Sequence, residues 1–148
     1  MDRAALDAAL AFGLPCGGWC PRGRATEDGR LDPRYPLRET PSSSYPQRTE
    51  WNVRDSDGTL ILTHGRPRGG TALTITLARR LDRPHLVLDL AAKPTPDPAT
   101  VRLWADAQDV TVLNVAGPRE IAHPGLQDAA RAFLEDALRG VRTSRRPA

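Results

Sequence analysis

The sequence predicts an α/β protein, a three-layer sandwich built on a mostly parallel sheet. Three short apolar runs, at residues 60–63, 86–88 and 110–113, are almost continuously apolar. Such runs are typical of parallel strands that are buried on both faces. Segments with helical periodicity lie between them, and strands that alternate with helices require right-handed crossovers that cover both faces of a sheet.

The first part of the chain predicts one helix and one strand before a long loop. Residues 2–12 carry Ala5, Leu6, Ala9 and Leu10 on one face, and Gly13 ends the helix. Residues 14–19 predict a short strand that runs into a glycine turn. Residues 20–43 are rich in Pro, Gly, Arg and Ser and predict a long irregular connection.

Residues 44–57 predict a helix with a capping box formed by Ser44 and Gln47. Arg48, Asn52 and Asp55 stand at i, i+4 and i+7 and form one polar stripe. A solvated helix face and a functional face both explain the stripe.

Three further helices are predicted, at residues 70–81, 97–108 and 125–139. The second is capped by Asp97 with Pro98 at its first position, and the last has the strongest apolar periodicity. We see no internal repeat, and we expect a single ligand-binding domain at residues 1–140 and a basic tail at residues 141–148.

Composition and charge narrow the class of protein. No apolar run approaches the roughly 20 residues of a membrane span, and the start of the chain does not resemble a signal peptide, so we expect a cytoplasmic protein without a membrane partner.

The formal charge is +3 and Lys93 is the only lysine. The other basic residues are arginines, whose planar guanidinium group binds phosphate oxygens through paired hydrogen bonds, as lysine does not. Without an aromatic-rich strand for base stacking we expect no nucleic-acid partner. Cys16 and Cys20 are interpreted as reduced structural thiols; they lack the further ligands of a metal site.

Ligands of open parallel sheets bind beyond the carboxyl ends of the strands. The segments that follow the four predicted strands should therefore meet at one edge. They are residues 17–24, residues 64–71, Asp89 and residues 114–120.

The segment at residues 64–71 carries the clearest signal. A strand, the pair Gly69 and Gly70, and a helix present backbone N–H groups and the positive end of a helix dipole to an anion. Thr71 adds a hydroxyl, and Arg66 and Arg68 can clamp the oxygens of the anion. The alternative is a plain tight turn. Neither a Walker loop nor the dinucleotide glycine pattern occurs.

Other strand-end residues offer supporting chemistry. The turn with Asn114, Gly117 and Pro118 is followed by Arg119, whose guanidinium group can donate paired hydrogen bonds to an anion. Asp89 would hold a ribose hydroxyl or cap the next segment. His64 would be a hydrogen-bonding residue or a general base, while His85 and His123 are interpreted as structural or exposed.

Several long segments resemble the molybdenum cofactor carrier family, the circularly permuted YpsA-like proteins of the SLOG superfamily. They are DRAALDAAL, CGGWCPRGR, EDG, YPLRET, QRTEWNVRDSDGTLIL, GGTALT and LNVAGPRE, which together span nearly the whole chain. The resemblance implies a Rossmann-like fold, homo-oligomers, and binding of a nucleotide-like or pterin phosphate, with molybdopterin as cargo. With the strand-end argument it gives these ligand-binding candidates: Gly17, Gly18, Trp19, Arg22, Arg24, Glu39, Thr40, Arg48, Asn52, His64, Gly65, Gly69, Gly70, Thr71, Asp89, Asn114, Gly117, Pro118 and Arg119.

The sequence departs from the family at its start. Family members carry a strand and a Ser-Gly-Gly-Gln-Thr-Gly loop directly before the pair that is Asp2-Arg3 here. Our hypothesis is that the start codon is misplaced and that in-frame upstream codons spell this segment.

A second departure concerns catalysis. The phosphoribohydrolases of the superfamily place a glutamate one helical turn after their glycine loop, whereas residues 72–77 here contain no acid. We therefore favour a carrier or sensor without catalytic residues. The alternatives are a nucleotide-processing hydrolase, in which His64, Glu39 or Asp89 supplies the acid or base, and an interaction module with a decayed site.

Overall fold

The computed structural model describes residues 1–26 and 29–141. A three-stranded parallel sheet with strand order β6-β5-β7 lies at its centre. The strands are β5 (Gly58–Thr63), β6 (His85–Asp89) and β7 (Leu113–Ala116). Every residue of β5 is buried, as predicted for a strand between two layers of helices.

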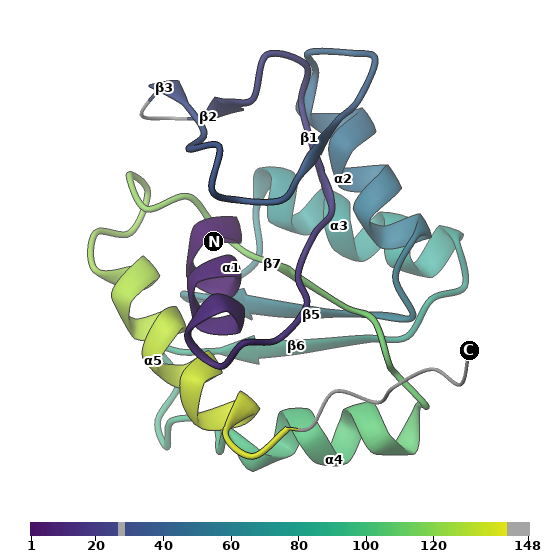
Figure 1. Cartoon of the computed structure of the whole chain (residues 1–148). Coiled ribbons are helices and arrows are strands. Elements are labelled where there is room, and N and C mark those ends of the chain that lie inside the picture. Colours follow the sequence, from purple (N-terminus) through teal and green to yellow (C-terminus); the bar gives the residue numbers. More distant parts are fainter. Residues whose placement is uncertain (27–28, 142–148) are drawn as a thin grey trace, which may run out of the picture.

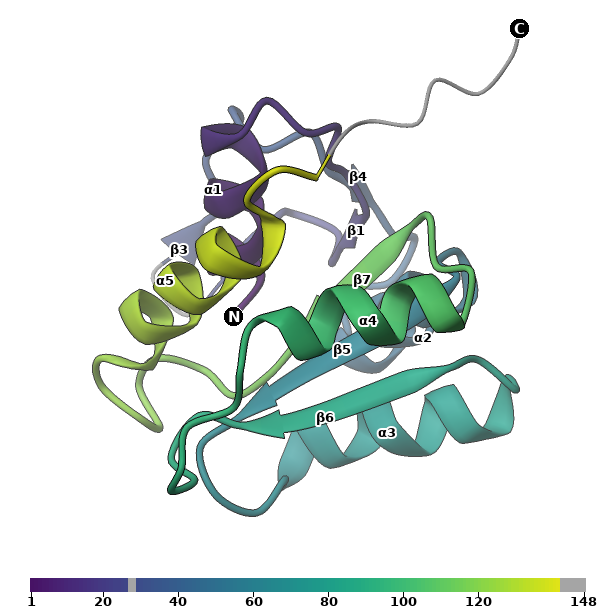
Figure 2. The same cartoon turned by 90° about the horizontal axis from the view of Figure 1, so that it is seen from below.

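Five helices of the described residues lie around this sheet (Figures 1 and 2): α1 (Asp2–Ala11), α2 (Tyr45–Arg54), α3 (Gly69–Arg80), α4 (Ala99–Ala107) and α5 (Leu126–Leu138). The main core joins Leu60 and Leu62 of β5 to buried residues of α1, α4 and α5. Side chains alternate along a strand, so Ile61 points to the opposite face, where α3 contacts β5. Val53 of α2 packs on Leu77 and Ala78 of α3. The predicted three-layer α/β sandwich is confirmed.

The segment between α1 and α2 folds outside the main sheet. The strands β1 (Trp19–Cys20) and β4 (Arg38–Glu39) pair in parallel, and β2 (Ala25–Thr26) and β3 (Gly29–Arg30) pair in antiparallel. The strand predicted at residues 14–19 is therefore wrong except at Trp19. The reason is local, since Pro15 has no N–H and Gly18 adopts a φ of 131°.

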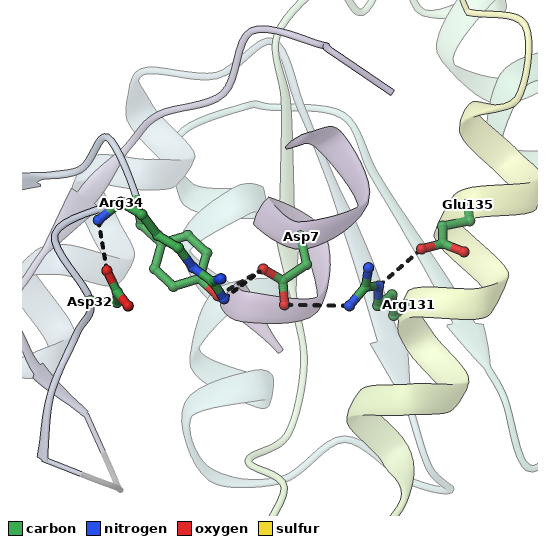
Figure 3. A network of polar contacts seen from close by, with 6 residues as sticks. Asp7, Asp32, Arg34, Arg131 and Glu135 are labelled. Atoms are coloured by element: carbon green, nitrogen blue, oxygen red, sulfur yellow. Dashed lines mark hydrogen bonds and ion pairs between the residues drawn. The ribbon is translucent and has the colours of Figure 1, made fainter. Parts of the chain in front are cut away.

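A polar network fastens this outer segment to two helices (Figure 3). The hydroxyl of Tyr35, a buried residue, donates to Asp7 of α1 over 2.7 Å. Arg131 of α5 lies 3.9 Å from the other oxygen of Asp7 and pairs with Glu135 at 2.9 Å. Asp7 thus joins the outer segment, α1 and α5.

Two predicted features are corrected, and α2 ends at Arg54 where residue 57 was predicted. The last strand is predicted at residues 110–113 but begins at Leu113, because the carboxylate of Asp57 accepts from the N–H groups of Thr111 and Val112 and holds these residues in a turn. The predicted capping box is also wrong: Ser44 precedes α2, but the side chain of Gln47 accepts from Ser42 N at 2.8 Å.

The other helices confirm their predictions to within two residues at each end. Asp97 accepts from Ala99 N at 2.9 Å, as expected of a capping residue. Among the described residues, no helix combines the length and apolar character that crossing a membrane needs. The predicted tail lies outside the described residues except for Val141.

The buried face of α5 should dominate stability. Leu134 is 1% exposed within the main core, so Leu134→Ala should lower the free energy of unfolding by about 2–5 kcal/mol. Leu103 on α4 is 71% exposed, and Leu103→Ala should change it by no more than about 0.5 kcal/mol. Urea unfolding followed by circular dichroism compares the two; equal effects would contradict this core assignment.

Candidate functional site

A cavity of about 920 Å³ opens at the carboxyl ends of β5 and β7. Its walls come from four places: α2, the loop after β5 with the start of α3, the end of β7 with the loop that follows, and Asp2 at the start of α1. The lining residues are Asp2, Tyr45, Pro46, Arg48, Thr49, Asn52, His64, Gly65, Arg66, Arg68, Gly69, Gly70, Thr71, Leu73, Thr74, Asn114, Val115, Ala116, Gly117, Pro118, Arg119, Ile121, Ala122 and His123.

The start of α3 presents its first amides to this cavity. Arg68 precedes the helix in an extended conformation, and its carbonyl accepts from Thr71 N at 3.1 Å and from Ala72 N at 3.3 Å. No described residue accepts from the N–H groups of Gly69 and Gly70. These two donors, with the positive end of the helix dipole, suit an anion.

Asp89 fixes the loop that leads into α3. Its Oδ1 accepts from Gly65 N at 2.9 Å and from Ala91 N at 2.8 Å. The bond from Gly65 and then that from Ala91 hold the pKa of Asp89 below its usual range. Asp89 lies outside the cavity lining and acts on the cavity through Gly65.

Four arginines give the cavity its charge: Arg48, Arg66, Arg68 and Arg119. Asp2 is the one carboxylate among the lining residues of the described chain, and it forms an ion pair with Arg48. The charge of the lining is therefore positive. Guanidinium groups bind carboxylates and phosphates through paired hydrogen bonds.

Tyr45 organises two of these arginines. The guanidinium of Arg119 lies 4.8 Å from the centre of its ring, and that of Arg48 lies 5.4 Å from it. The buried Nε of Arg48 has no hydrogen-bond partner among the described residues. Tyr45 therefore gathers positive charge from α2 and from the loop after β7 at one side of the cavity.

Two histidines meet where the loops after β5 and β7 approach each other. The rings of His64 and His123 are stacked, with their centres 4.6 Å apart and an angle of 24° between their planes. His64 was a candidate, but His123 was interpreted as structural or exposed. The structure places it, half-buried, in the cavity lining.

The structure brings together eleven of the predicted ligand-binding residues: Arg48, Asn52, His64, Gly65, Gly69, Gly70, Thr71, Asn114, Gly117, Pro118 and Arg119. The expectation that all strand ends share one edge fails for residues 17–24, because β1 pairs with β4 and not with the main sheet. Outside the lining lie Gly17, Gly18, Trp19, Arg22, Arg24, Glu39, Thr40 and Asp89.

Several of these outer residues hold their own segment together. Arg24 donates to four backbone carbonyl groups between Leu31 and Leu37. Glu39 accepts from Gly23 N at 2.7 Å, and the Thr40 hydroxyl donates to a carbonyl two residues further along the chain.

Asn52 connects the outer segment to the cavity. Its side chain accepts from Trp19 N at 2.8 Å and donates to Trp19 O at 3.1 Å, and it also lines the cavity. A Cβ at Gly18 would lie 2.9 Å from the Asn52 oxygen, so glycine permits this approach. The polar stripe of α2 therefore faces neighbouring segments and the cavity, because Arg48 pairs with Asp2 and Asp55 accepts from the Trp19 indole.

Sequence reasoning missed other lining residues, chiefly Asp2, Tyr45, Ile121 and His123. Tyr45 stands three residues before Arg48, a spacing that places both on one helix face. Asp2 carries no signal of this kind, since it reaches the cavity only through the packing of α1.

The arrangement suits an anion better than a metal cation. Among residues 1–26 and 29–141, no group of three or more His, Cys, Asp or Glu side chains is placed to hold a metal ion. Arginine forks, free helix amides and half-buried apolar side chains instead fit an organic ligand that carries an oxyanion.

Known proteins resemble this chain in sequence and in structure. The model of the Circularly permutated YpsA SLOG family matches residues 1–138. A crystal structure of a protein named Putative molybdenum carrier protein, from Syntrophus aciditrophicus SB, is 44% identical, with a TM-score of 0.86. The match covers 93% of this chain and 87% of that one. No curated protein matches the chain.

The two glycines at the start of α3 should respond differently to alanine. Gly69 has a φ of 52°, which favours glycine, whereas Gly70 has no such φ, and a Cβ on either would meet no atom within 4 Å. Gly69→Ala should lower the free energy of unfolding by about 1 kcal/mol, while Gly70→Ala should leave it unchanged or slightly raised. Thermal unfolding of both variants measures this; a larger loss for Gly70→Ala would contradict the assigned helix start.

Proposed function

The chain belongs to the Circularly permutated YpsA SLOG family, and on that premise we propose that it is a carrier or sensor of a phosphate-bearing small molecule. The ligand occupies the cavity at the carboxyl ends of β5 and β7. One observation carries the proposal: among the described residues, four arginines and the free amides of Gly69 and Gly70 line this cavity, and the one carboxylate in the lining is already paired.

Different parts of the cavity bind the phosphate and the rest of the ligand. The phosphate lies against the Gly69 and Gly70 amides, where a side chain on Gly70 would intrude. Arg68 and Arg119 bind the phosphate oxygens as forks. The rest of the ligand lies along the half-buried part of the lining toward Val115 and Ala116.

Molybdopterin is our first candidate for the cargo, and a nucleotide is the second. The similar protein from Syntrophus aciditrophicus SB bears the name of a molybdenum carrier. A cavity of about 920 Å³ falls within the range of roughly 300–1,000 Å³ that is common for small-molecule sites. Both candidates combine a phosphate with a planar ring system. The arginines of the lining support binding of the phosphate, and its half-buried side chains support binding of the ring.

Binding without turnover is favoured over hydrolysis. Cleavage of an N-glycosidic bond needs an acid or base near the reacting atoms. Helix α3 contains no carboxylate between Gly69 and Arg80, and Asp2 is paired with Arg48. Glu39 and Asp89 lie outside the cavity lining, so His64 is the one hydrolase candidate that lines the cavity. We accordingly propose a cytoplasmic binding protein that releases its ligand unchanged.

A ligand panel tests this proposal directly. We expect a molybdopterin preparation, AMP or ADP-ribose to raise the unfolding temperature, and a ligand at 100 times its dissociation constant should add about 2.7 kcal/mol. Arg119→Ala should weaken binding about tenfold or more, because it removes a charged hydrogen bond. Gly70→Ala should weaken it similarly by filling the place of the phosphate.

Arg79→Ala is the matched control, because Arg79 is exposed near the far end of α3 and lies outside the cavity lining. It removes the same charge and should leave the affinity unchanged. Equal losses for Arg79→Ala and Arg119→Ala would show nonspecific charge attraction. Release of a free base from AMP would favour the hydrolase, and an unchanged unfolding temperature with every ligand would refute the phosphate site.

A further inference from the structure

Strand β6 forms an edge of the main sheet, on the side of β5 away from β7 (Figure 2). Backbone bonds from Thr59 N to Pro84 O and from Leu90 N to Thr63 O bracket its pairing with β5. Backbone direction alternates along a parallel strand, so residues 84, 86, 88 and 90 face β5. The N–H and C=O groups of His85, Val87 and Asp89 therefore point away from β5.

This edge lacks the usual protection against pairing. Its centre reads Leu86-Val87-Leu88 without proline, and its one acidic residue, Asp89, stands at the last position of the strand. Val87 is 39% exposed, and Leu86 and Leu88 are only half-buried although they pack against the main core. The C=O of Asp89 accepts from Ala92 N at 3.2 Å, whereas the outward-pointing groups of His85 and Val87 have no partner among the described residues. An apolar edge strand with free backbone groups is a template for another strand.

The opposite edge of the sheet differs. Helix α1 contacts β7, and every residue of β7 is half-buried, whereas Val87 at the centre of β6 is exposed. Within the described chain, β6 is thus the more open of the two edges.

The sequence of β6 is complementary to itself when it is reversed. In an antiparallel pair centred on Val87, Val87 lies opposite the partner's Val87, and Leu86 lies opposite the partner's Leu88. His85 then lies opposite the partner's Asp89 at both ends of the pair. The outward-pointing residues 85, 87 and 89 become the hydrogen-bonded positions, as antiparallel geometry requires, and apolar and polar side chains each meet their own kind.

From this complementarity we propose that the protein forms a two-fold symmetric dimer in which β6 pairs with β6 of a second copy. The two three-stranded sheets become one continuous sheet, and each copy uses the same surface, as in an isologous interface. The pairing covers the exposed part of Val87 and the open sides of Leu86 and Leu88. The dimer does not depend on the proposed ligand, because none of its contacts involves the cavity lining.

Light scattering after gel filtration tests the oligomer. We expect the wild type to have twice the 16.1 kDa chain mass. His85→Asp places a carboxylate opposite the partner's Asp89 at both ends of the pair, and like charges directly opposite each other destabilise pairing, so this variant should be a monomer. His85→Gln adds no charge and is the matched control; it should remain a dimer.

A cysteine at the two-fold axis gives a positive test. Hydrogen-bonded antiparallel pairs place their Cα atoms about 5.5 Å apart, within the range that a disulfide accepts. Val87→Cys should therefore form a covalent dimer under mild oxidation. Leu103→Cys, at a position that is 71% exposed on α4, and the wild type with Cys16 and Cys20 should not.

The results separate the alternatives cleanly. A wild type that is still monomeric at about 100 μM, where a dimer with a dissociation constant of about 1 μM would form, would overturn the proposal. A wild-type dimer that His85→Asp leaves intact and that Val87→Cys does not cross-link would place the interface elsewhere and would also overturn it.

Discussion

The burial of β5 is the constraint on which the rest of the structure depends. All six of its residues are buried, and it pairs with a parallel strand on each side. Because the neighbours run in the same direction, Asp89 and Ala116 lie beside the end of β5 at Thr63 and Ile61. The loops that follow β5 and β7 therefore start from one edge of the sheet, and the cavity forms between them.

Carboxylates at the ends of the strands hold the loops around this frame. Asp57 accepts from the backbone and hydroxyl of Thr111 and from Val112 N, Asp89 accepts from the N–H groups of two loops, and Glu120 accepts from two amides at the start of α5. These hydrogen bonds keep the pKa of each carboxyl below its usual range. These three carboxylates accept hydrogen bonds from backbone N–H groups and lie outside the cavity lining. The arginines of the cavity therefore have few acidic side chains near them.

Local signals predicted the central fold well and the outer segment poorly. Continuous apolar runs marked β5 and β6, although only β5 is buried throughout; β6 lies at an edge of the sheet and exposes Val87. The boundary of β7 was missed because Val110 and Val112 are as apolar as strand residues, while Asp57, over 50 residues away, holds the turn there. Trp19 was assigned to a strand of the main sheet, but its pairing with Arg38 and its bonds to Asn52 are contacts between distant segments.

The sequence by itself determined the α/β class, the helices that follow each central strand and the glycine pair at the start of α3, since periodicity and backbone freedom are local properties. It also indicated the arginines and their suitability for an oxyanion. Only the tertiary structure decided which candidates share the cavity. It excluded residues 17–24 from the lining, because β1 joins a separate ladder. It added Asp2, Tyr45 and His123, because their positions depend on how α1, α2 and the loop after β7 pack together, which no local pattern encodes.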